Sequence, residues 1–304
     1  MIEVKNISHT YMAGTPFAKK ALNDVSFTWR EGEKLALIGA CGSGKSTLLS
    51  HLAGLSVPTS GEIIVDGTNI NAELPPFWHD FFGRKKIRIQ AAIRAAKQKV
   101  GLAFQYAEQQ LFEETVFSDV AFGAKQAGIK DDDPALAAMV KEALAAVDLP
   151  LSDEFAACSP FALSGGQMRR VAIAGILIMR PKYLLLDEPT AGLDPKSRHA
   201  LMQQIKKFAA KNKTAVLIVT HSMNNAAEFA ERIVVMNKGK IALNGPPRDV
   251  FQNRDVLAAA ALKPPPITSL LAKLRVGGLA VDDTIIDFAE GMTEILTVCG
   301  KKRI

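Results

Sequence analysis

The chain has 304 residues, of which 48% are hydrophobic and 22% are charged, as in an ordinary globular protein with one or two domains. The net charge of +6 permits a nucleic acid or an anionic membrane surface as a neighbour and establishes neither. Apolar runs such as VAIAGILIM are at most nine residues long, whereas a membrane-spanning helix needs about 20. The start MIEVKNISHTYM has no apolar signal core, and three scattered cysteines fit a reducing compartment, so we expect a cytoplasmic protein.

Short apolar segments in the first third of the chain predict β-strands. The alternation in VSFTW (25–29) indicates a half-buried antiparallel strand. The continuous apolar run KLALIG (34–39) is typical of a strand buried on both faces. GEIIVDGTNI (61–70) predicts a strand with an Asp-Gly turn.

The rest of the chain mixes helical and strand patterns. Residues 105–170 have a helix-like pattern, and Pro134 is placed to start one of the helices. KYLLLDEP (182–189) and TAVLIVTH (214–221) predict buried strands, and RIVVMNKGKIALNG (232–245) predicts a hairpin that turns at Lys238 and Gly239. The segment after residue 245, with three consecutive prolines at 264–266, predicts a small helical extension.

This order of elements predicts an α/β fold with a mostly parallel core sheet, an antiparallel β subdomain and an inserted helical subdomain over about 105–170. We expect a main domain at residues 1–245 and a C-terminal extension at residues 246–304.

Residues 39–47, GACGSGKST, match the phosphate-loop pattern G-x-x-x-x-G-K-[ST] between a predicted strand and the predicted helix KSTLLSHLAGL. The glycines let the backbone curl so that N–H groups and a helix N-terminus face a phosphate. We expect Lys45 to reach the β- and γ-phosphates of ATP, the Ser46 hydroxyl to bind Mg²⁺ and Thr47 to contact the α-phosphate. The predicted nucleotide-binding residues here are Gly39, Ala40, Cys41, Gly42, Ser43, Gly44, Lys45, Ser46 and Thr47.

Cys41 lies within this loop, where a small inert spacer is the plain interpretation. The alternative is a thiol that the helix N-terminus makes reactive.

Asp187 and Glu188 end the apolar strand segment YLLLDE. Side chains alternate between the faces of a strand, so two adjacent acids at its carboxyl end can have different roles. We expect Asp187 to belong to the Mg²⁺ shell and Glu188 to polarise the attacking water. A turn-forming Asp-Glu-Pro is the structural alternative.

His221 ends another strand segment, and Gln105 follows the apolar stretch GLAF. A lone histidine there is more often structural. In parallel sheets, however, ligands bind at the carboxyl ends of the strands, where three predicted strands here end in GACGSGKS, DE and H. We therefore expect His221 and Gln105 to join the catalytic site, with the Gln105 amide binding Mg²⁺ or the water.

The motifs GACGSGKST, Gln105, LSGGQ, LLLDEP, AGLD and TH follow one another in an order that resembles ATP-binding cassette (ABC) ATPases over residues 1 to about 245. In that family two cassettes pair head to tail, and each LSGGQ contacts the γ-phosphate held by the other cassette. Small residues at a helix N-terminus suit such an anion contact, and a serine-capped helix start is compatible with it. The resemblance implies contact with the partner's nucleotide or its interface by Leu163, Ser164, Gly165, Gly166, Gln167 and Asp194.

The same resemblance implies that Tyr11 stacks on adenine, although a lone strand tyrosine usually serves packing.

A narrower similarity links AEQQLFEETVFSDVAFG (107–123) and LSGGQMRRVAIAG (163–175) to the ATPases of energy-coupling factor (ECF) transporters, most of all to their A-prime member. These transporters take up vitamins and transition-metal ions in prokaryotes. The similarity implies a second ABC ATPase, identical or not, a transmembrane coupling subunit and a substrate-binding membrane subunit. It also implies a peripheral position on the cytoplasmic face of the membrane and a C-terminal extension that joins the dimer, with no nucleic acid expected.

One segment departs from this family. Residues 74–99 are about a dozen residues longer than usual, with seven lysines or arginines and no acid between Arg84 and Lys99. Phe77, Trp78, Phe81 and Phe82 precede them. A solvated basic helix with these aromatic residues as an anchor on the core is the plain interpretation, and contact with the anionic inner leaflet or the membrane partner is the alternative. Ala107 also stands where the family commonly has proline.

The resemblance therefore implies an ATP-hydrolysing motor whose dimer closes on ATP and opens after hydrolysis. Two alternatives stay open: a non-transport ABC ATPase acting on nucleic acid or ribosomes, and the motor of another ABC transporter class. The basic segment favours the first, but this sequence lacks the second cassette, coiled coils and zinc modules that are common there.

Overall fold

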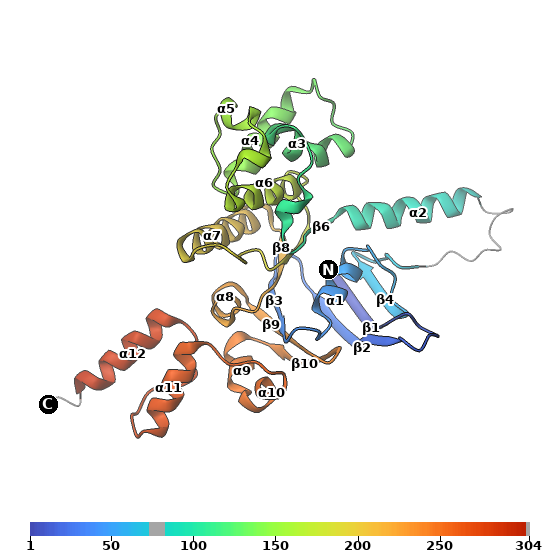
Figure 1. Cartoon of the computed structure of the whole chain (residues 1–304). Helices are drawn as coiled ribbons and strands as arrows, with labels where there is room; N and C mark the ends of the chain where they lie inside the picture. Colours follow the sequence, from blue (N-terminus) through green and yellow to red (C-terminus); the bar gives the residue numbers. More distant parts are fainter. Residues whose placement is uncertain (73–82, 302–304) are drawn as a thin grey trace.

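The computed structural model describes residues 1–72 and 83–301, and its strands form two sheets (Figure 1). The smaller sheet is antiparallel, in the order β2-β1-β4-β5. Its strands are β1 (Ile2–Tyr11), β2 (Lys19–Trp29), β4 (Ser60–Val65) and β5 (Thr68–Asn69). The predicted alternation is present in β2, where Val25, Phe27 and Trp29 are buried between exposed neighbours. The predicted turn between β4 and β5 is formed by Asp66 and Gly67, both with positive φ.

The larger sheet has the order β10-β9-β3-β8-β7-β6. Strands β3 (Lys34–Gly39), β6 (Val100–Ala103), β7 (Tyr183–Asp187), β8 (Ala215–Val219) and β9 (Arg232–Asn237) run parallel, and only β10 (Lys240–Gly245) is antiparallel to its neighbour. Every residue of β7 and β8 is buried, which explains their unbroken apolar sequences. The predicted α/β fold with a mostly parallel core is confirmed, and the carboxyl ends of β3, β8, β7 and β6 meet at one edge.

The larger sheet separates two hydrophobic cores because side chains alternate along its strands. In β3, Leu35 and Leu37 join one core, while Ala36 and Ile38 join the other. Three helices follow the strand ends at the carboxyl edge: α1 (Lys45–Leu52), α7 (Pro195–Asn212) and α8 (Met223–Phe229). Burial on both faces fixes the strand ends, and with them the side chains of the site described below.

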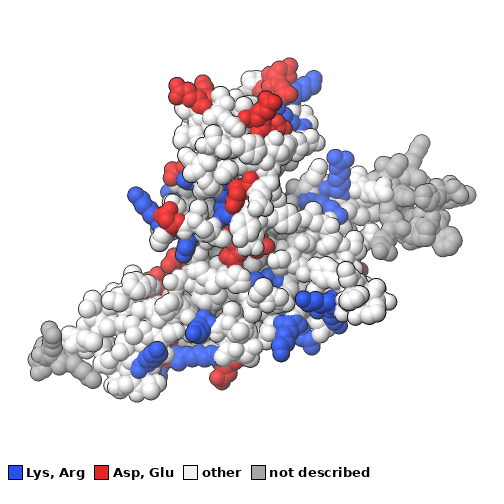
Figure 2. Space-filling view, in the orientation of Figure 1, with Lys and Arg blue, Asp and Glu red and all other residues white. Residues whose placement is uncertain are grey.

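A helical subdomain is inserted between β6 and β7, as the sequence predicts (Figure 1). It contains the 3-10 turns η2 (Ala107–Gln110) and η3 (Pro160–Ala162) and the helices α3 (Val116–Gln126), α4 (Pro134–Ala145), α5 (Asp153–Ala157) and α6 (Gly165–Leu177). Helix α4 starts at Pro134, where the Asp133 carboxylate accepts a hydrogen bond from the Ala135 amide at 2.8 Å. On the face drawn in Figure 2, acidic side chains gather over this subdomain, whereas lysines and arginines are more frequent in the lower part of the view.

The C-terminal extension lies at the opposite end from the helical subdomain (Figure 1). Its helices are α9 (Pro247–Gln252), α10 (Arg254–Ala259), α11 (Pro266–Val276) and α12 (Phe288–Lys301). Ile267, Leu271, Val281 and Ile285 form a small separate core around α11. The boundary at residue 246 and a role in dimerisation stay predictions.

The basic segment ends in helix α2 (Gly83–Gln98), which extends away from the two sheets (Figure 1). Ala96 is buried, and the Lys97 ammonium donates to the Gly54 carbonyl at 2.9 Å, so the last turn of α2 is tied to the loop after α1. The predicted aromatic anchor, Phe77, Trp78, Phe81 and Phe82, lies outside the described residues. Within the described part of the chain, no helix combines the length and apolar character that crossing a bilayer requires.

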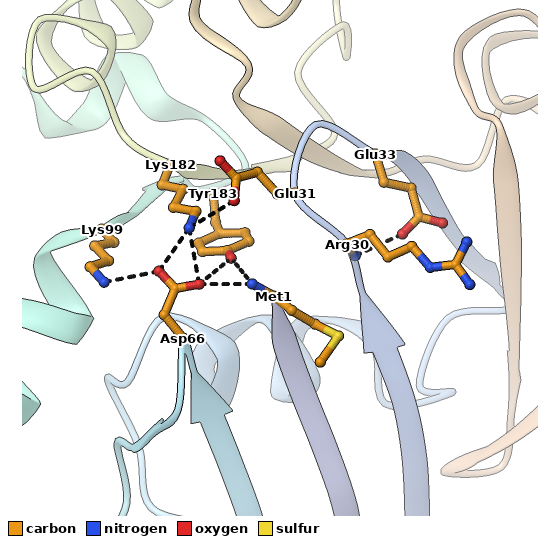
Figure 3. A network of polar contacts seen from close by, with 8 residues as sticks. All are labelled: Met1, Arg30, Glu31, Glu33, Asp66, Lys99, Lys182 and Tyr183. Atoms are coloured by element: carbon orange, nitrogen blue, oxygen red, sulfur yellow. Dashed lines mark hydrogen bonds and ion pairs between the residues drawn. The ribbon is translucent and has the colours of Figure 1, made fainter.

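A polar network around Asp66 joins the two sheets (Figure 3). The Asp66 carboxylate, at the β4–β5 turn, accepts hydrogen bonds from the Tyr183 hydroxyl at 2.8 Å, Lys99 at 2.9 Å and Lys182 at 3.0 Å. Lys182 also pairs with Glu31 at 2.9 Å. Since Tyr183 begins β7 and Lys99 precedes β6, the network lies at the amino ends of the strands, away from the carboxyl edge.

Candidate active site

The phosphate-loop sequence forms a tight loop between β3 and α1 that only glycine permits at two positions. A Cβ atom on Gly39 would lie 2.4 Å from the Met236 carbonyl oxygen, and one on Gly44, with φ of 104°, would lie 2.6 Å from the Ala21 carbonyl oxygen. Gly44 caps α1 without any side-chain hydrogen bond. The first amide groups of this helix therefore face the loop without a side-chain acceptor, as an anion site requires.

The tip of the β9–β10 hairpin is hydrogen-bonded to this loop. The Gly239 amide donates to the Ser43 carbonyl at 3.0 Å, and the Asn23 amide donates to the Gly239 carbonyl at 2.8 Å. Lys45 crosses the loop and donates to the carbonyls of Gly39 at 2.8 Å and Ala40 at 2.9 Å. Burial lowers the pKa of Lys45. The ammonium is thus held where a phosphate bound by the loop would meet it.

Asp187, the last residue of β7, lies beside Ser46, with 3.4 Å between the Ser46 hydroxyl and an Asp187 carboxylate oxygen. Burial raises the pKa of Asp187, opposed by the hydrogen bond from Ser46 and the charge of Lys45. A hydroxyl and a carboxylate beside a phosphate loop are oxygen donors of the kind that Mg²⁺ prefers, since Mg²⁺ uses one or two carboxylates together with phosphate oxygens.

Glu188 differs from Asp187 in its backbone and its surroundings. Its φ is 48°, an uncommon left-handed conformation for glutamate, and such conformations concentrate at functional sites. One carboxylate oxygen is buried without a hydrogen-bond partner and lies 3.6 Å from the His221 Nε2 atom. Burial and the neighbouring Asp187 charge raise the pKa of Glu188 to about 7. A carboxyl group with this pKa can accept a proton from water near neutral pH.

These side chains line one pocket of about 270 Å³ at the carboxyl edge of the larger sheet. The structure brings together eleven of the residues predicted from sequence: Tyr11, Cys41, Gly42, Gly44, Lys45, Ser46, Thr47, Gln105, Asp187, Glu188 and His221. Gly39, Ala40 and Ser43 belong to the same loop. The prediction missed Lys19, Lys20, Ala21 and Val219, which also line the pocket. The only signal in the sequence is the lysine pair at the start of the alternating strand β2.

Tyr11 lines this pocket, with about half of its surface exposed. Its hydroxyl lies 3.1 Å from the Thr47 Oγ1 atom, and its ring meets the His9 ring edge-on, with centroids 4.6 Å apart. The exposed ring is therefore available for stacking and is not buried in the core.

The LSGGQ segment lies elsewhere, at the start of α6, and none of its residues lines the pocket. Ser164 and Gln167 form a capping box. The Gln167 backbone N–H donates to the Ser164 hydroxyl at 3.3 Å, and the Ser164 backbone N–H donates to the Gln167 side-chain oxygen at 3.1 Å. Ser164 and Gly165 are exposed. The Asp194 carboxylate likewise caps α7, and its hydrogen bonds with Ser197 lower its pKa.

A phosphate loop, two strand-end acids, a strand-end histidine and a separate LSGGQ helix on this fold define an ABC-type ATPase. The sequence pattern of the ABC transporter family matches residues 22–191. The chain belongs to this family and, within it, to the ATP-binding proteins of energy-coupling factor transporters.

Curated relatives of nearly the same length carry that description. One from Caldanaerobacter subterraneus is 43% identical over 97% of this chain and 96% of its own length. One from Streptococcus agalactiae is 45% identical over 96% of this chain and 98% of its own length. Both are described as energy-coupling factor transporter ATP-binding protein EcfA2.

Solved structures agree with the fold. The cbiO1 protein of Clostridium perfringens, described as part of an ABC transporter complex, has a TM-score of 0.68 and 31% identity over 84% of this chain and 92% of that chain. A dimeric ATP-binding cassette with ADP and phosphate has a TM-score of 0.68 and 30% identity over 81% of this chain and 98% of that chain. The predicted family, fold and ATPase class are thus confirmed.

Proposed function

We propose that the chain is the ATP-hydrolysing motor of an ECF-type importer, for which vitamins or transition-metal ions are the substrate classes. One observation carries this proposal: the phosphate-loop pocket is formed within the chain, whereas LSGGQ is exposed outside it. An ATPase built this way needs a second cassette to complete each site. The near full-length relatives described as ECF transporter proteins support the transport role.

Six polar residues of the pocket have roles that its geometry supports. Ser46, Asp187 and the Gln105 amide would hold Mg²⁺, which offsets charge on the phosphates when bound. Glu188 accepts a proton from the attacking water, because its buried carboxylate oxygen has no other partner. His221, 3.6 Å away, contacts the γ-phosphate and orients that water. Lys45 and the amides of α1 stabilise the charge that develops on the phosphate.

The partners follow from the same arrangement. Ser164, with its helix N-terminus, would contact ATP held by a second ABC ATPase, identical or diverged, and Asp194 would lie at that interface. A transmembrane coupling subunit would dock beside η2 and the helical subdomain, and a membrane subunit would bind the substrate. The chain would then lie on the cytoplasmic face of the membrane, with no nucleic acid expected. Closure on ATP and opening after hydrolysis would move the coupling subunit.

The substitution Glu188→Gln tests the catalytic assignment. It removes the proton acceptor and keeps the size of the side chain, so we expect ATP binding within about twofold of wild type and turnover reduced by about 100-fold or more. Nucleotide affinity is measured on the purified chain, and ATP hydrolysis on the complex purified from membranes. Wild-type turnover by the intact Glu188→Gln complex would refute the role of Glu188.

Purification of the chain from native membranes tests the transport role. Recovery with a second ABC ATPase and integral membrane subunits is expected. Bound RNA, DNA or ribosomes without membrane subunits would instead support the non-transport alternative. Membrane subunits of another transporter type would support the remaining alternative, the motor of another ABC transporter class.

A further inference from the structure

Arg169 on α6 is a buried cation five residues after Ser164, and its side chain is 6% exposed. A buried guanidinium is costly unless all its donor groups have partners, so its contacts show what it is placed to hold. Two of these contacts go to functional loops that lie far apart in the sequence.

The first partner is Glu108 in η2. The Arg169 Nε and Nη2 atoms donate to the two oxygens of the Glu108 carboxylate, each at 2.9 Å. Burial alone would raise the pKa of Glu108, but the hydrogen bonds from Arg169 outweigh it and keep the pKa low. Glu108 follows Gln105 by three residues, so the pair fixes the loop that carries Gln105 to α6.

The second partner is the backbone after β7. The Arg169 Nη1 atom donates to the Ala191 carbonyl, between Glu188 and Asp194. The Ala191 amide in turn donates to the Glu188 carbonyl at 3.1 Å, and this hydrogen bond closes a turn that begins at Glu188. On the other side of this turn, Asn225 of α8 donates to the Thr190 hydroxyl at 3.1 Å. Arg169 therefore reaches the segment whose conformation sets the position of Glu188.

We propose that Arg169 is a positioning residue that joins the Gln105 loop, the LSGGQ helix and the turn after Glu188 into one unit. Movement of α6, when LSGGQ engages a nucleotide, is transmitted by one planar side chain to the loop of Gln105, which would hold Mg²⁺, and to the turn of Glu188, which accepts the proton of the attacking water. Arginine suits this role because its fork binds a carboxylate with two groups and leaves a third for the carbonyl, which a lysine ammonium cannot reproduce in that geometry.

The test separates positioning from a general role in folding. The variants are Arg169→Met, Arg169→Lys, Glu108→Gln and the Arg169→Met/Glu108→Gln double variant. Arg180→Met is the matched control, since Arg180 makes a carboxylate pair with Glu142 at 2.5 Å, but its side chain is 59% exposed and touches neither loop. ATP hydrolysis is measured on the complex purified from membranes, and ATP affinity and thermal unfolding on the purified chain.

We expect Arg169→Met to lower kcat at least tenfold with KM and ATP affinity within twofold of wild type. Glu108→Gln should also lower kcat, and the double variant should be no slower than Arg169→Met, since Glu108 acts through its contact with Arg169. Arg169→Lys should recover part of the loss, and Arg180→Met should match wild type.

Two outcomes would overturn the proposal. One is a kcat within twofold of wild type for Arg169→Met in a folded complex. The other is a loss of kcat that merely follows a lower folded fraction, with KM and ATP affinity impaired to the same degree. If Arg169→Met does not fold, wild-type kcat in both Arg169→Lys and Glu108→Gln overturns it. The proposal depends on ATP hydrolysis and not on the transported substrate, so a different transport role would leave it standing.

Discussion

Asp187 and Glu188 are neighbours in sequence but have different contacts in the site. Asp187 meets Ser46, whereas Glu188 turns out of the strand with a positive φ and keeps one buried oxygen unpaired. Strand alternation predicts that two adjacent acids separate in this way. It does not predict the left-handed backbone of Glu188, which depends on the following turn and on the Ala191 contact.

Cys41 allows a chemical test of the pocket at the scale of one side chain. It is exposed and lines the pocket. We expect a thiol-alkylating reagent at Cys41 to block ATP binding, and ATP with Mg²⁺ to protect the thiol, because the adduct and the nucleotide occupy the same space. Modification is followed by mass spectrometry and ATP affinity by fluorescence titration.

Cys299, also exposed but on α12, serves as the internal control, and ATP should leave its rate of modification unchanged. A Cys41→Ser chain that loses ATP binding on alkylation as fast as wild type would show that the effect arises at another thiol.

Single residues also mark the limit of sequence reasoning. The phosphate loop and the strand-end acids were found because their spacing carries the chemistry. Lys19 and Lys20 were missed, since two lysines at the start of a strand resemble any solvated strand end. Arg169 stands within the segment LSGGQMRRVAIAG, and nothing in its spacing indicates that its partners are Glu108 and the Ala191 carbonyl.

At the scale of elements, Asp66 connects the β4–β5 turn to the amino ends of the core strands. Burial would raise the pKa of Asp66, but hydrogen bonds from the terminal ammonium, Lys99, Tyr183 and Lys182 outweigh it and hold the pKa below its usual range. The carboxylate side chain is 16% exposed, so solvent screens these contacts little. Replacing it should weaken the junction between the two sheets.

We expect Asp66→Asn to lower the free energy of unfolding at pH 7 by about 2 kcal/mol. Because the folded-state pKa is depressed, the stabilisation is complete above the unfolded-state pKa of about 4 and is lost as the pH falls toward the folded-state value. The difference between wild type and variant should therefore shrink below about pH 4. Urea unfolding from pH 7 to pH 3 measures it.

The control for this experiment is Asp153→Asn, since the Asp153 side chain is 92% exposed in its pair with Lys141. No measurable change is expected there. A constant difference between Asp66→Asn and wild type down to pH 3 would show that packing, and not charge, stabilises the junction.

Helix α2 offers a test of the basic segment. Arg88 and Arg94 are exposed on this helix, and the sequence from Arg84 to Lys99 has no acid. If this helix meets the anionic inner leaflet, Arg88→Glu/Arg94→Glu should reduce binding to phosphatidylglycerol vesicles at low salt by about tenfold or more, at about 1 kcal/mol for each basic residue near the surface. Vesicle co-sedimentation measures it, with phosphatidylcholine vesicles as the uncharged reference.

The matched control for α2 is Lys207→Glu/Lys240→Glu, which makes the same change of net charge at two exposed lysines outside the helix. If both double variants lost vesicle binding equally, the attraction would come from net charge alone. If neither double variant changed vesicle binding, α2 would be a solvated helix without a membrane contact.

For the whole molecule, most of the architecture follows from local sequence. Alternation, continuous apolar runs and turn residues predicted both sheets, the inserted helices and the helical extension, because burial on one or two faces leaves a direct trace in residue order. The strand order and the way α6 lies relative to the pocket leave no such trace, since they depend on contacts between distant segments. For that reason the pocket residues could be predicted to converge, whereas the contacts between subdomains could not.

The separation of LSGGQ from the pocket makes a prediction about the assembled molecule. Gly165 is exposed at the first position of α6, and a Cβ there would meet no atom within 4 Å, so Gly165→Glu should fold normally and place an acid where a partner's γ-phosphate would approach. ATP affinity of the purified chain should stay within about twofold of wild type, whereas Lys45→Ala should lose it, because only Lys45 belongs to the pocket of its own chain. In the complex purified from membranes, Gly165→Glu should lower ATP hydrolysis by about tenfold or more through charge repulsion. If Gly165→Glu weakened ATP binding by the purified chain, LSGGQ would belong to the ATP site of its own chain. That result would contradict an ATP site shared between two cassettes.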